Sequence, residues 1–134
     1  MKKRDFLKTS AIIASSMLFP RTLISQGKSF KKIRTAHIGV GGMGFHDLKA
    51  ISSHNSVEVV GLCDVDSDAL LKLKVKYPNV KTYKDYRIML SELSDQIDAV
   101  IISTPDHTHA PAALMAMKNN KAVYCQKQIG RAHV

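Results

Sequence analysis

Residues 39–44 read Gly39-Val40-Gly41-Gly42-Met43-Gly44, which is the pattern Gly-x-Gly-x-x-Gly. A short β-branched run, 32–40, leads into this loop, and apolar residues at helical spacing follow it across 42–53. A glycine-rich loop between a strand and a helix is typical of the first turn of a dinucleotide-binding fold. The stretch therefore predicts a phosphate-binding loop and a Rossmann-type architecture around it.

The glycines of this loop have separate tasks. Gly39 permits the tight turn, Gly41 lets the backbone approach a pyrophosphate, and Gly44 lets the helix pack closely on the strand. The start of the helix adds unpaired N–H groups and the positive end of its dipole. We expect the cofactor-binding part of the loop to consist of Gly39, Gly41, Gly42, Met43 and Gly44.

An acidic residue stands where a dinucleotide fold needs one. Asp64 lies 20 residues after Gly44 and ends a second apolar run, 57–64. A carboxylate there accepts hydrogen bonds from ribose hydroxyls and repels a 2′-phosphate, so the cofactor is predicted to be NAD or NADP, with NAD favoured. Methyltransferases also pair a glycine-rich loop with an acid after the second strand. The end of the fifth strand, described below, favours the dinucleotide fold instead.

Strand-like and helix-like segments alternate along the body of the chain. The strand-like runs are almost continuously apolar, which is typical of a parallel sheet covered on both faces. Helical segments between them indicate right-handed βαβ units. The fold class is therefore α/β, a doubly wound parallel sheet of Rossmann type with five strands present. The expected strands are 32–40, 57–64, 80–83, 97–103 and 122–125, and the expected helices are 42–53, 66–77, 85–93 and 110–119.

The loop after the fourth strand carries polar residues that should reach the cofactor. Ligands of such sheets lie at the carboxyl ends of the strands, so Thr104, Pro105 and His109 are expected to line the cleft. His107 and His109 alternate as metal ligands sometimes do, but no third ligand is evident. We therefore expect both histidines to form hydrogen bonds at the cofactor site and expect no metal. Asp106 is expected to cap the helix that follows.

A lysine ends the fifth strand. Lys127 follows Gln126 and the short apolar run 122–125. A lysine at the mouth of a nicotinamide cleft can polarise a carbonyl or hydroxyl, or move a proton as hydride is transferred. Without its context, the same lysine would be interpreted as an exposed charge at a strand end.

Taken with their order along the chain, these features resemble the N-terminal domain of the Gfo/Idh/MocA family of oxidoreductases. The resemblance covers 32–127 and rests on the glycine loop, on Asp64, on the string Thr104-Pro105-x-x-x-His109 and on the strand-end lysine. The family's Glu-Lys-Pro motif reads Gln126-Lys127-Gln128 in this chain.

The resemblance implies an activity and further parts of the protein. Lys127 would be the catalytic lysine at the nicotinamide, and Gln126 would also lie at the cofactor. The family acts by hydride transfer on sugars, polyols and related compounds. Exported relatives also include NAD-dependent glycosidases, which oxidise the sugar transiently. Full members continue with a sixth strand and a substrate domain, which is missing here, and we expect the full-length protein to form a homo-oligomer.

Net charge excludes one class of partner. The chain has 134 residues and a formal charge of +9. Nine Lys/Arg and one acid lie in 1–34, whereas eleven Lys/Arg and ten acids lie in 35–134. A nucleic-acid footprint needs basic residues on a folded face, so no nucleic-acid partner is expected. Two cysteines make no disulfide framework, and no stretch is apolar for long enough to predict a stable membrane span.

Residues 1–31 are expected to be a leader and linker. A basic start, a mildly apolar stretch and a polar exit are typical of a secretory signal. The string Lys3-Arg4-Asp5-Phe6-Leu7-Lys8 resembles the twin-arginine export motif, with Lys3 in place of the first arginine. We expect an exported, periplasmic protein, or a cytoplasmic one if the leader is not cleaved. The alternative is a disordered basic tail or a short amphipathic start.

The last seven residues do not continue the strand–helix alternation. Ile129–Val134 matches the translation of a common sequencing adapter, so we expect 128–134 to be a non-native tail. We place the dinucleotide-binding domain at 32–127. We also expect the 134 residues alone to be a nucleotide-binding module that is inactive as an enzyme.

Overall fold

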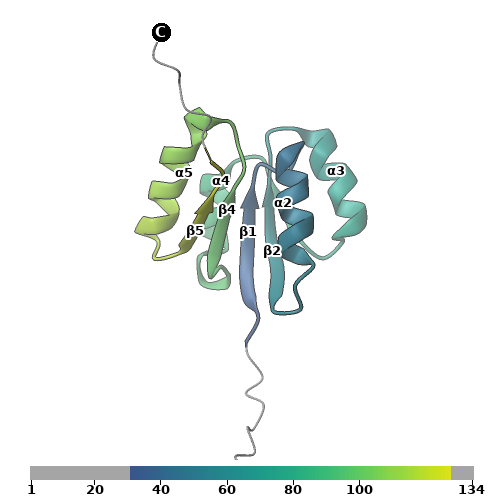
Figure 1. Cartoon of the computed structure of the whole chain (residues 1–134), viewed down its shortest axis with the longest axis horizontal. Helices are drawn as coiled ribbons and strands as arrows, with labels where there is room; N and C mark the ends of the chain where they lie inside the picture. Colours follow the sequence, from purple (N-terminus) through teal and green to yellow (C-terminus); the bar gives the residue numbers. More distant parts are fainter. Residues whose placement is uncertain (1–30, 128–134) are drawn as a thin grey trace, which may run out of the picture.

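The computed structural model describes residues 31–127, in which five parallel strands form one sheet in the order β3-β2-β1-β4-β5. The strand tips all point to the same edge of the sheet, where the loops that follow them gather (Figure 1). The strands are β1 (Ile33–Ile38), β2 (Val57–Cys63), β3 (Lys81–Tyr83), β4 (Ala99–Ile102) and β5 (Ala122–Cys125). The helices are α2 (Met43–Ser52), α3 (Ser67–Lys76), α4 (Tyr86–Glu92) and α5 (Asp106–Lys118), with a 3-10 turn at Ser94–Gln96. The α/β prediction is confirmed. The expected leader at 1–30 and tail at 128–134 lie outside the described residues.

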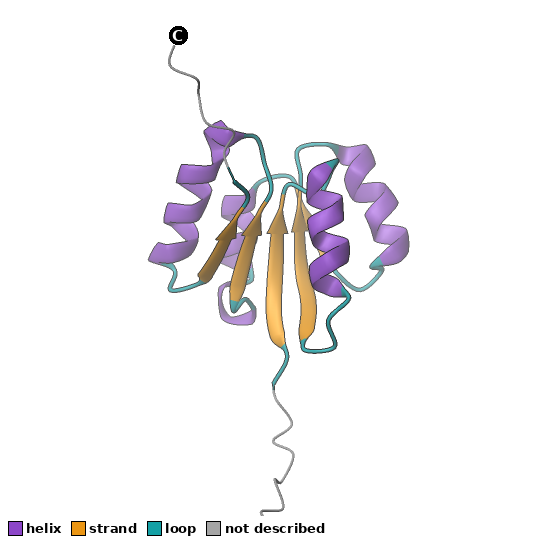
Figure 2. Ribbon diagram, in the orientation of Figure 1, coloured by secondary structure: helices purple, strands orange, loops and turns teal. Residues whose placement is uncertain are grey.

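Helices cover both faces of the sheet, and each face has its own apolar core. Helices α2 and α3 lie on one face, which is turned toward the viewer in Figure 2, and α4 lies behind the sheet. The first core contains Leu48, Leu62 and Leu73, and the second packs α4 and α5 against alternate residues of β1 and β4. The near-continuous apolar strands of the sequence follow from this coverage of both faces.

Side chains of acidic residues begin two of the helices. Asp66 is the N-cap of α3, and its side chain accepts a hydrogen bond from Asp68 N. Asp85 accepts in the same way from Arg87 N at the start of α4. The helices that follow β2 and β3 thus both begin at an aspartate whose side chain accepts a hydrogen bond from the backbone two residues on.

The start of α5 differs from the expectation. The helix begins at Asp106, four residues before the predicted 110, and it includes Pro111 in its second turn. Pro105 occupies the N-cap position and Asp106 makes no capping hydrogen bond, so the predicted Asp106 cap is wrong. Pro111 has a helical φ but no N–H, so α5 lacks the backbone hydrogen bond that position 111 would otherwise donate to the His107 carbonyl oxygen. The loop after β4 is consequently shorter than the sequence predicted.

An ion pair joins two neighbouring strands at the amino-terminal edge of the sheet, opposite the loops that follow the strands. The Arg34 guanidinium donates to both carboxylate oxygens of Asp98, at 3.0 and 2.7 Å, and to the Asp95 carbonyl oxygen at 2.9 Å. Arg34 N also donates to Asp98. This fork ties the start of β1 to the entry of β4, the two neighbouring strands whose far ends carry the glycine loop and Thr104.

Candidate functional site

At two of its four glycines, Gly39 and Gly44, the glycine loop packs too closely against other backbone to allow a side chain. Gly39 adopts φ +80°, and a Cβ there would lie 2.8 Å from the Ser103 backbone. A Cβ on Gly44 would overlap the Gly39 carbonyl and lie 3.2 Å from Ser103 Cβ. Both glycines therefore let β1, α2 and the end of β4 approach one another, as the sequence predicted for Gly39 and Gly44.

The outer part of the same loop leaves its backbone open. A Cβ on Gly41 would have Asp64 Oδ2 as its nearest neighbour, at 3.7 Å, and nothing lies within 4 Å of a Cβ built on Gly42. The exposed backbone of these residues precedes the N-terminus of α2, which is where a pyrophosphate is bound in dinucleotide folds. Met43 begins α2 with 66% of its surface exposed and lines neither of the two cavities beside the loop.

Asp64 lies against this loop. Its Oδ2 accepts hydrogen bonds from Val40 N at 2.8 Å and from Gly41 N at 3.0 Å, and its Oδ1 accepts from Asp66 N at 2.9 Å. The carboxylate therefore joins the end of β2 to the glycine loop. It also lines the cavity next to it.

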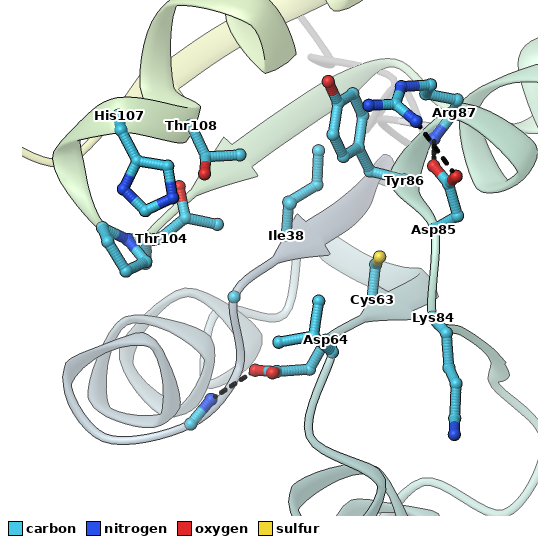
Figure 3. Close-up of a pocket in the computed structure, with 15 residues that line it drawn as sticks. Ile38, Cys63, Asp64, Lys84, Asp85, Tyr86, Arg87, Thr104, His107 and Thr108 are labelled. Atoms are coloured by element: carbon cyan, nitrogen blue, oxygen red, sulfur yellow. Dashed lines mark hydrogen bonds and ion pairs between the residues drawn. The ribbon is translucent and has the colours of Figure 1, made fainter.

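A cavity of about 500 Å³ opens at the carboxyl ends of the four strands β1 to β4. Figure 3 shows Asp64, Cys63 and Ile38 between two walls, one carrying Thr104, His107 and Thr108 and the other carrying Tyr86 and Arg87. Its volume suits a nucleotide-sized ligand. Its lining brings together residues from all four strand ends: Gly39, Gly41, Asp64, Lys84, Tyr86, Arg87, Thr104, Pro105 and His107.

The floor of the cavity is apolar. Cys63 is 3% exposed, and burial raises the pKa of its thiol to about 12, so the sulfur stays uncharged at neutral pH. Tyr86 stands in the far wall with the Arg87 guanidinium 5.3 Å from its ring centre. Arg87 also pairs with Asp85 at 3.3 Å. Tyr86 and Arg87 were not predicted as site residues, because nothing in the short 80–83 strand indicates that its end reaches the glycine loop.

Only part of the expected histidine loop faces the cavity. Thr104, Pro105 and His107, three of the four residues expected at the cofactor site from this loop, line the cavity. His109 does not line it, because α5 begins earlier than expected and places this ring in the interior, at 3% exposure. There its Nε2 donates to the Thr104 carbonyl oxygen at 2.6 Å. His109 therefore fixes the Thr104 backbone from the side away from the cavity. The Thr104 hydroxyl is buried and has no hydrogen-bond partner in the described chain.

The strand-end pair Gln126–Lys127 is anchored to α2. Gln126 Nε2 donates to both carboxylate oxygens of Asp47, at 3.0 and 2.9 Å, and Ser103 Oγ donates to Asp47 Oδ2 at 2.6 Å. Lys127 is exposed, and its backbone N donates to Gln126 Oε1 at 3.2 Å. Gln126 and Lys127 do not line the cavity beside Asp64; they lie beyond β4, on the other side of the glycine loop. Sequence reasoning did not single out Asp47 or Ser103.

A second hollow, of about 520 Å³, adjoins the outer side of the loop between α2 and α3. Gly41 and Gly42 form one wall, and Lys72 and Lys76 on α3 form the other. Lys76 Nζ stands 5.7 Å from the ring centre of Phe45. Positive charge is therefore available on this side of the loop.

Two further observations concern the described residues 31–127. They hold no group of three or more His, Cys, Asp or Glu side chains that is arranged to bind a metal ion. None of their helices combines the length and the apolar character that crossing a membrane requires.

Comparison with known proteins agrees with this geometry. The model of an oxidoreductase family with an NAD-binding Rossmann fold matches residues 33–129. A glycosyl hydrolase family 109 protein of Stenotrophomonas maltophilia is 38% identical over 97% of this chain, and an inositol 2-dehydrogenase of Salmonella paratyphi B is 29% identical over 72%. The crystal structure of myo-inositol 2-dehydrogenase from Lactobacillus plantarum superposes with a TM-score of 0.64 at 30% identity over 77% of the chain. This chain spans about 30% of the length of each of these proteins.

Proposed function

The chain belongs to the Gfo/Idh/MocA family of oxidoreductases, and on that premise we propose that it forms the NAD-binding part of an enzyme that transfers hydride to or from a sugar, polyol or related compound. The observation that carries the proposal is the contact between Asp64 and the glycine loop, beside a cavity of about 500 Å³. A ribose-binding carboxylate and an open phosphate-binding backbone are thus in one place.

The two halves of the cofactor are assigned to the two sides of this loop. The backbone at Gly42 and the first N–H groups of α2 bind the pyrophosphate, and Gly41, whose own N–H donates to Asp64, lets it approach closely. Asp64 accepts hydrogen bonds from the adenosine ribose, and the cavity beyond it takes the adenine between Tyr86 and the Thr104 wall. The nicotinamide then lies toward the ends of β4 and β5.

The nicotinamide ring, when bound, supplies the acceptor or donor of hydride. The chain's own contribution to the reaction is the ammonium group of Lys127, at the end of β5. In the reducing direction the ammonium group polarises the substrate carbonyl oxygen and gives it a proton as hydride reaches the carbon; in the oxidising direction the neutral amine takes the hydroxyl proton as hydride leaves the carbon. The Thr104 hydroxyl, which lacks a partner in the described chain, donates or accepts a hydrogen bond on the β4 side of the cofactor.

NAD is the preferred cofactor in this proposal. The negative charge of Asp64 at the ribose position repels a 2′-phosphate. Lys72 and Lys76 border the outer side of the loop, and Lys84 and Arg87 border the cavity, so the same region also offers positive charge to NADP. The ratio of NAD to NADP affinity measures which charge dominates.

An NAD-dependent glycosidase is the second candidate. The observation that favours it is the 38% identity to a glycosyl hydrolase family 109 protein across nearly the whole chain. Such an enzyme oxidises the sugar, cleaves the glycosidic bond and reduces the sugar again, so it needs the same cofactor site. Net accumulation of NADH with a free polyol supports the dehydrogenase. Release of the aglycone from a nitrophenyl N-acetylgalactosaminide without net NADH supports the glycosidase.

Cofactor binding is tested first on this chain, by calorimetric titration with NAD and with NADP. Saturable binding that weakens when Asp64 is replaced supports the proposal, and the absence of binding by the folded chain contradicts it. Lys127→Ala in the full-length enzyme is expected to lower kcat strongly while cofactor affinity stays within a few-fold of wild type. Unchanged turnover would remove Lys127 from the reaction.

We propose, in addition, that the protein is exported through its N-terminal segment. The support is the basic start and the twin-arginine-like string, including Lys3-Arg4. Expression of the intact gene with fractionation of periplasm and cytoplasm tests this. A Lys3→Ala/Arg4→Ala variant should stay in the cytoplasm, and equal distribution of both proteins would contradict export by this signal.

A further inference from the structure

We propose that Asp47 is a positioning residue: it binds the Gln126 side chain and thereby holds the strand end that carries Lys127 against the helix of the glycine loop. The inference deepens the proposed function, because Lys127 matters only if the cofactor lies at this edge. It also explains why an amide, and not a carboxylate, precedes the lysine in this chain.

The contacts define Asp47 as the meeting point of three strand-end segments. Asp47 lies one turn into α2, directly after the glycine loop. Its carboxylate accepts from Ser103 at the end of β4 and from Gln126 at the end of β5. Ser103 in turn packs against the positions that Gly39 and Gly44 keep free of side chains. One carboxylate therefore connects the phosphate-binding turn with both strand ends on the Lys127 side of the loop.

The chemistry of the pair fixes the orientation of the amide. A carboxylate is an acceptor only, so the NH₂ group of Gln126 must face Asp47. The amide oxygen is then directed away from Asp47, where it accepts from Lys127 N at 3.2 Å. The Gln126 backbone is held as well, because its N–H donates to the Ile102 carbonyl oxygen at 2.9 Å. Side chain and backbone of Gln126 together restrain the backbone of Lys127.

A carboxylate in place of the Gln126 amide would be incompatible with Asp47 at neutral pH. In Gln126→Glu the new carboxylate would stand at hydrogen-bonding distance from that of Asp47, and two carboxylates so close cannot both remain ionised. They would share one proton at low pH and repel at higher pH, as a coupled pair. Adding Asp47→Asn should remove the conflict, because the asparagine NH₂ can donate to the introduced carboxylate. The pairing thus predicts rescue by a second-site change.

The test compares the wild-type chain with four variants: Asp47→Asn, Gln126→Glu, the double variant, and Gln126→Ala. Each is followed by ¹⁵N NMR from pH 4 to pH 8, without cofactor. The Gln126 side-chain NH₂ signals of the wild type should be displaced in Asp47→Asn, because their charged acceptor is replaced by a neutral amide. The backbone N–H of residue 126 should exchange at least tenfold faster at pH 7 in Gln126→Glu.

The pH profile and the rescue separate positioning from a general loss of structure. At each pH the exchange rate is compared with that of wild type at the same pH. In Gln126→Glu the excess over wild type should disappear at the acid end of the range, whereas in Gln126→Ala it should persist at every pH. The double variant should exchange within about threefold of wild type at pH 7. Wild-type exchange in Gln126→Glu, or no rescue in the double variant, overturns the proposal.

An NADH titration of the same samples tests the proposed cofactor site separately from the Asp47–Gln126 contact. NADH is added to each chain at neutral pH and its affinity is measured. If no chain binds NADH, the proposed cofactor site is contradicted, while the NMR data still decide whether Asp47 holds Gln126. If wild type binds NADH and the Lys127 amide signal moves on binding, loss of that movement in Gln126→Glu and its return in the double variant support positioning of Lys127. Equal movement in all chains overturns it.

Discussion

Asp64 Oδ2 accepts a hydrogen bond from the backbone N–H of Gly41 at 3.0 Å, across 23 residues of sequence. The same oxygen accepts from Val40 N at 2.8 Å. The acid that the sequence assigned to the ribose therefore also fixes the loop that was assigned to the pyrophosphate. Binding of the two parts of a dinucleotide should consequently respond together to changes at this one carboxylate.

Asp64→Ala should weaken NAD binding by about tenfold or more, because hydrogen bonds to a charged group are each worth roughly 1.5–3 kcal/mol. NADP affinity should fall less, since the variant also loses the repulsion of the 2′-phosphate. Calorimetric titration with both cofactors measures the two effects. Asp68→Ala, which removes the same charge from the exposed first turn of α3, is the matched control. Equal NAD affinity in Asp64→Ala and wild type would remove the assigned role.

Gly44→Ala and Gly41→Ala should separate folding from binding. A methyl group at 44 would overlap the Gly39 carbonyl, so this variant should lose several kcal/mol of stability, as expected for overpacking against backbone. A methyl group at 41 meets only Asp64 and Ala69, at 3.7 and 4.0 Å. Gly41→Ala should therefore keep a near-native thermal midpoint while NAD binding weakens. A lower thermal midpoint for Gly41→Ala than for Gly44→Ala would contradict the assignment of Gly44 to packing and Gly41 to binding.

His37 should make the fold less stable in mild acid. The ring is 1% exposed, its Nδ1 has no partner in the described chain, and burial lowers its pKa to about 4 despite the nearby charge of Asp47. The unfolded chain takes up the proton near pH 6.5, well before the folded chain does. Stability is therefore full above about pH 6.5 and declines by on the order of 3 kcal/mol as the pH falls to about 4.

Urea unfolding of wild type and His37→Gln between pH 4 and pH 7 checks this effect. The free energy of unfolding of His37→Gln should depend less on pH than that of wild type between pH 4 and pH 7. His54→Gln, which alters an exposed histidine, should behave as wild type. A His37→Gln curve with the wild-type slope would mean that the buried ring is not what makes the fold acid-sensitive.

The Arg34–Asp98 fork should show the behaviour of a paired carboxylate. Hydrogen bonds from Arg34 hold the pKa of Asp98 well below its usual range. The contribution of Asp98 to the free energy of unfolding is therefore fully present above the ordinary aspartate pKa of about 4. It is lost progressively as the pH falls below that value. Asp98→Asn should be less stable than wild type at pH 7, and the gap should narrow below about pH 4. Thermal melts at a series of pH values test this, and a gap that widens in acid would contradict it.

The order and type of the elements could be predicted because local signals agree with the fold. Apolar runs, helical spacing and the glycine pattern all depend on residues close together in sequence. The start of α5 was misplaced because Pro111 resembles a helix boundary, whereas the helix includes it and begins five residues earlier, at Asp106. The error carried over to His109, whose predicted place in the cleft depended on a longer loop.

The site was predictable where a residue's task follows from the backbone around it. Gly39 and Gly44 are such cases, since φ and close packing require glycine there. Asp47, Ser103 and Tyr86 are different, because their importance comes from contacts between distant segments. Asp47 and Gln126 lie 79 residues apart, and no periodic pattern relates them.

The most direct test of the dinucleotide site is an NADH titration of the ¹⁵N-labelled chain, followed residue by residue. We predict saturable shifts that are concentrated on the amides of Gly41, Gly42 and Asp64 and that need a higher NADH concentration to saturate in Gly41→Ala. A folded chain whose glycine-loop amides do not move at millimolar NADH would contradict the account.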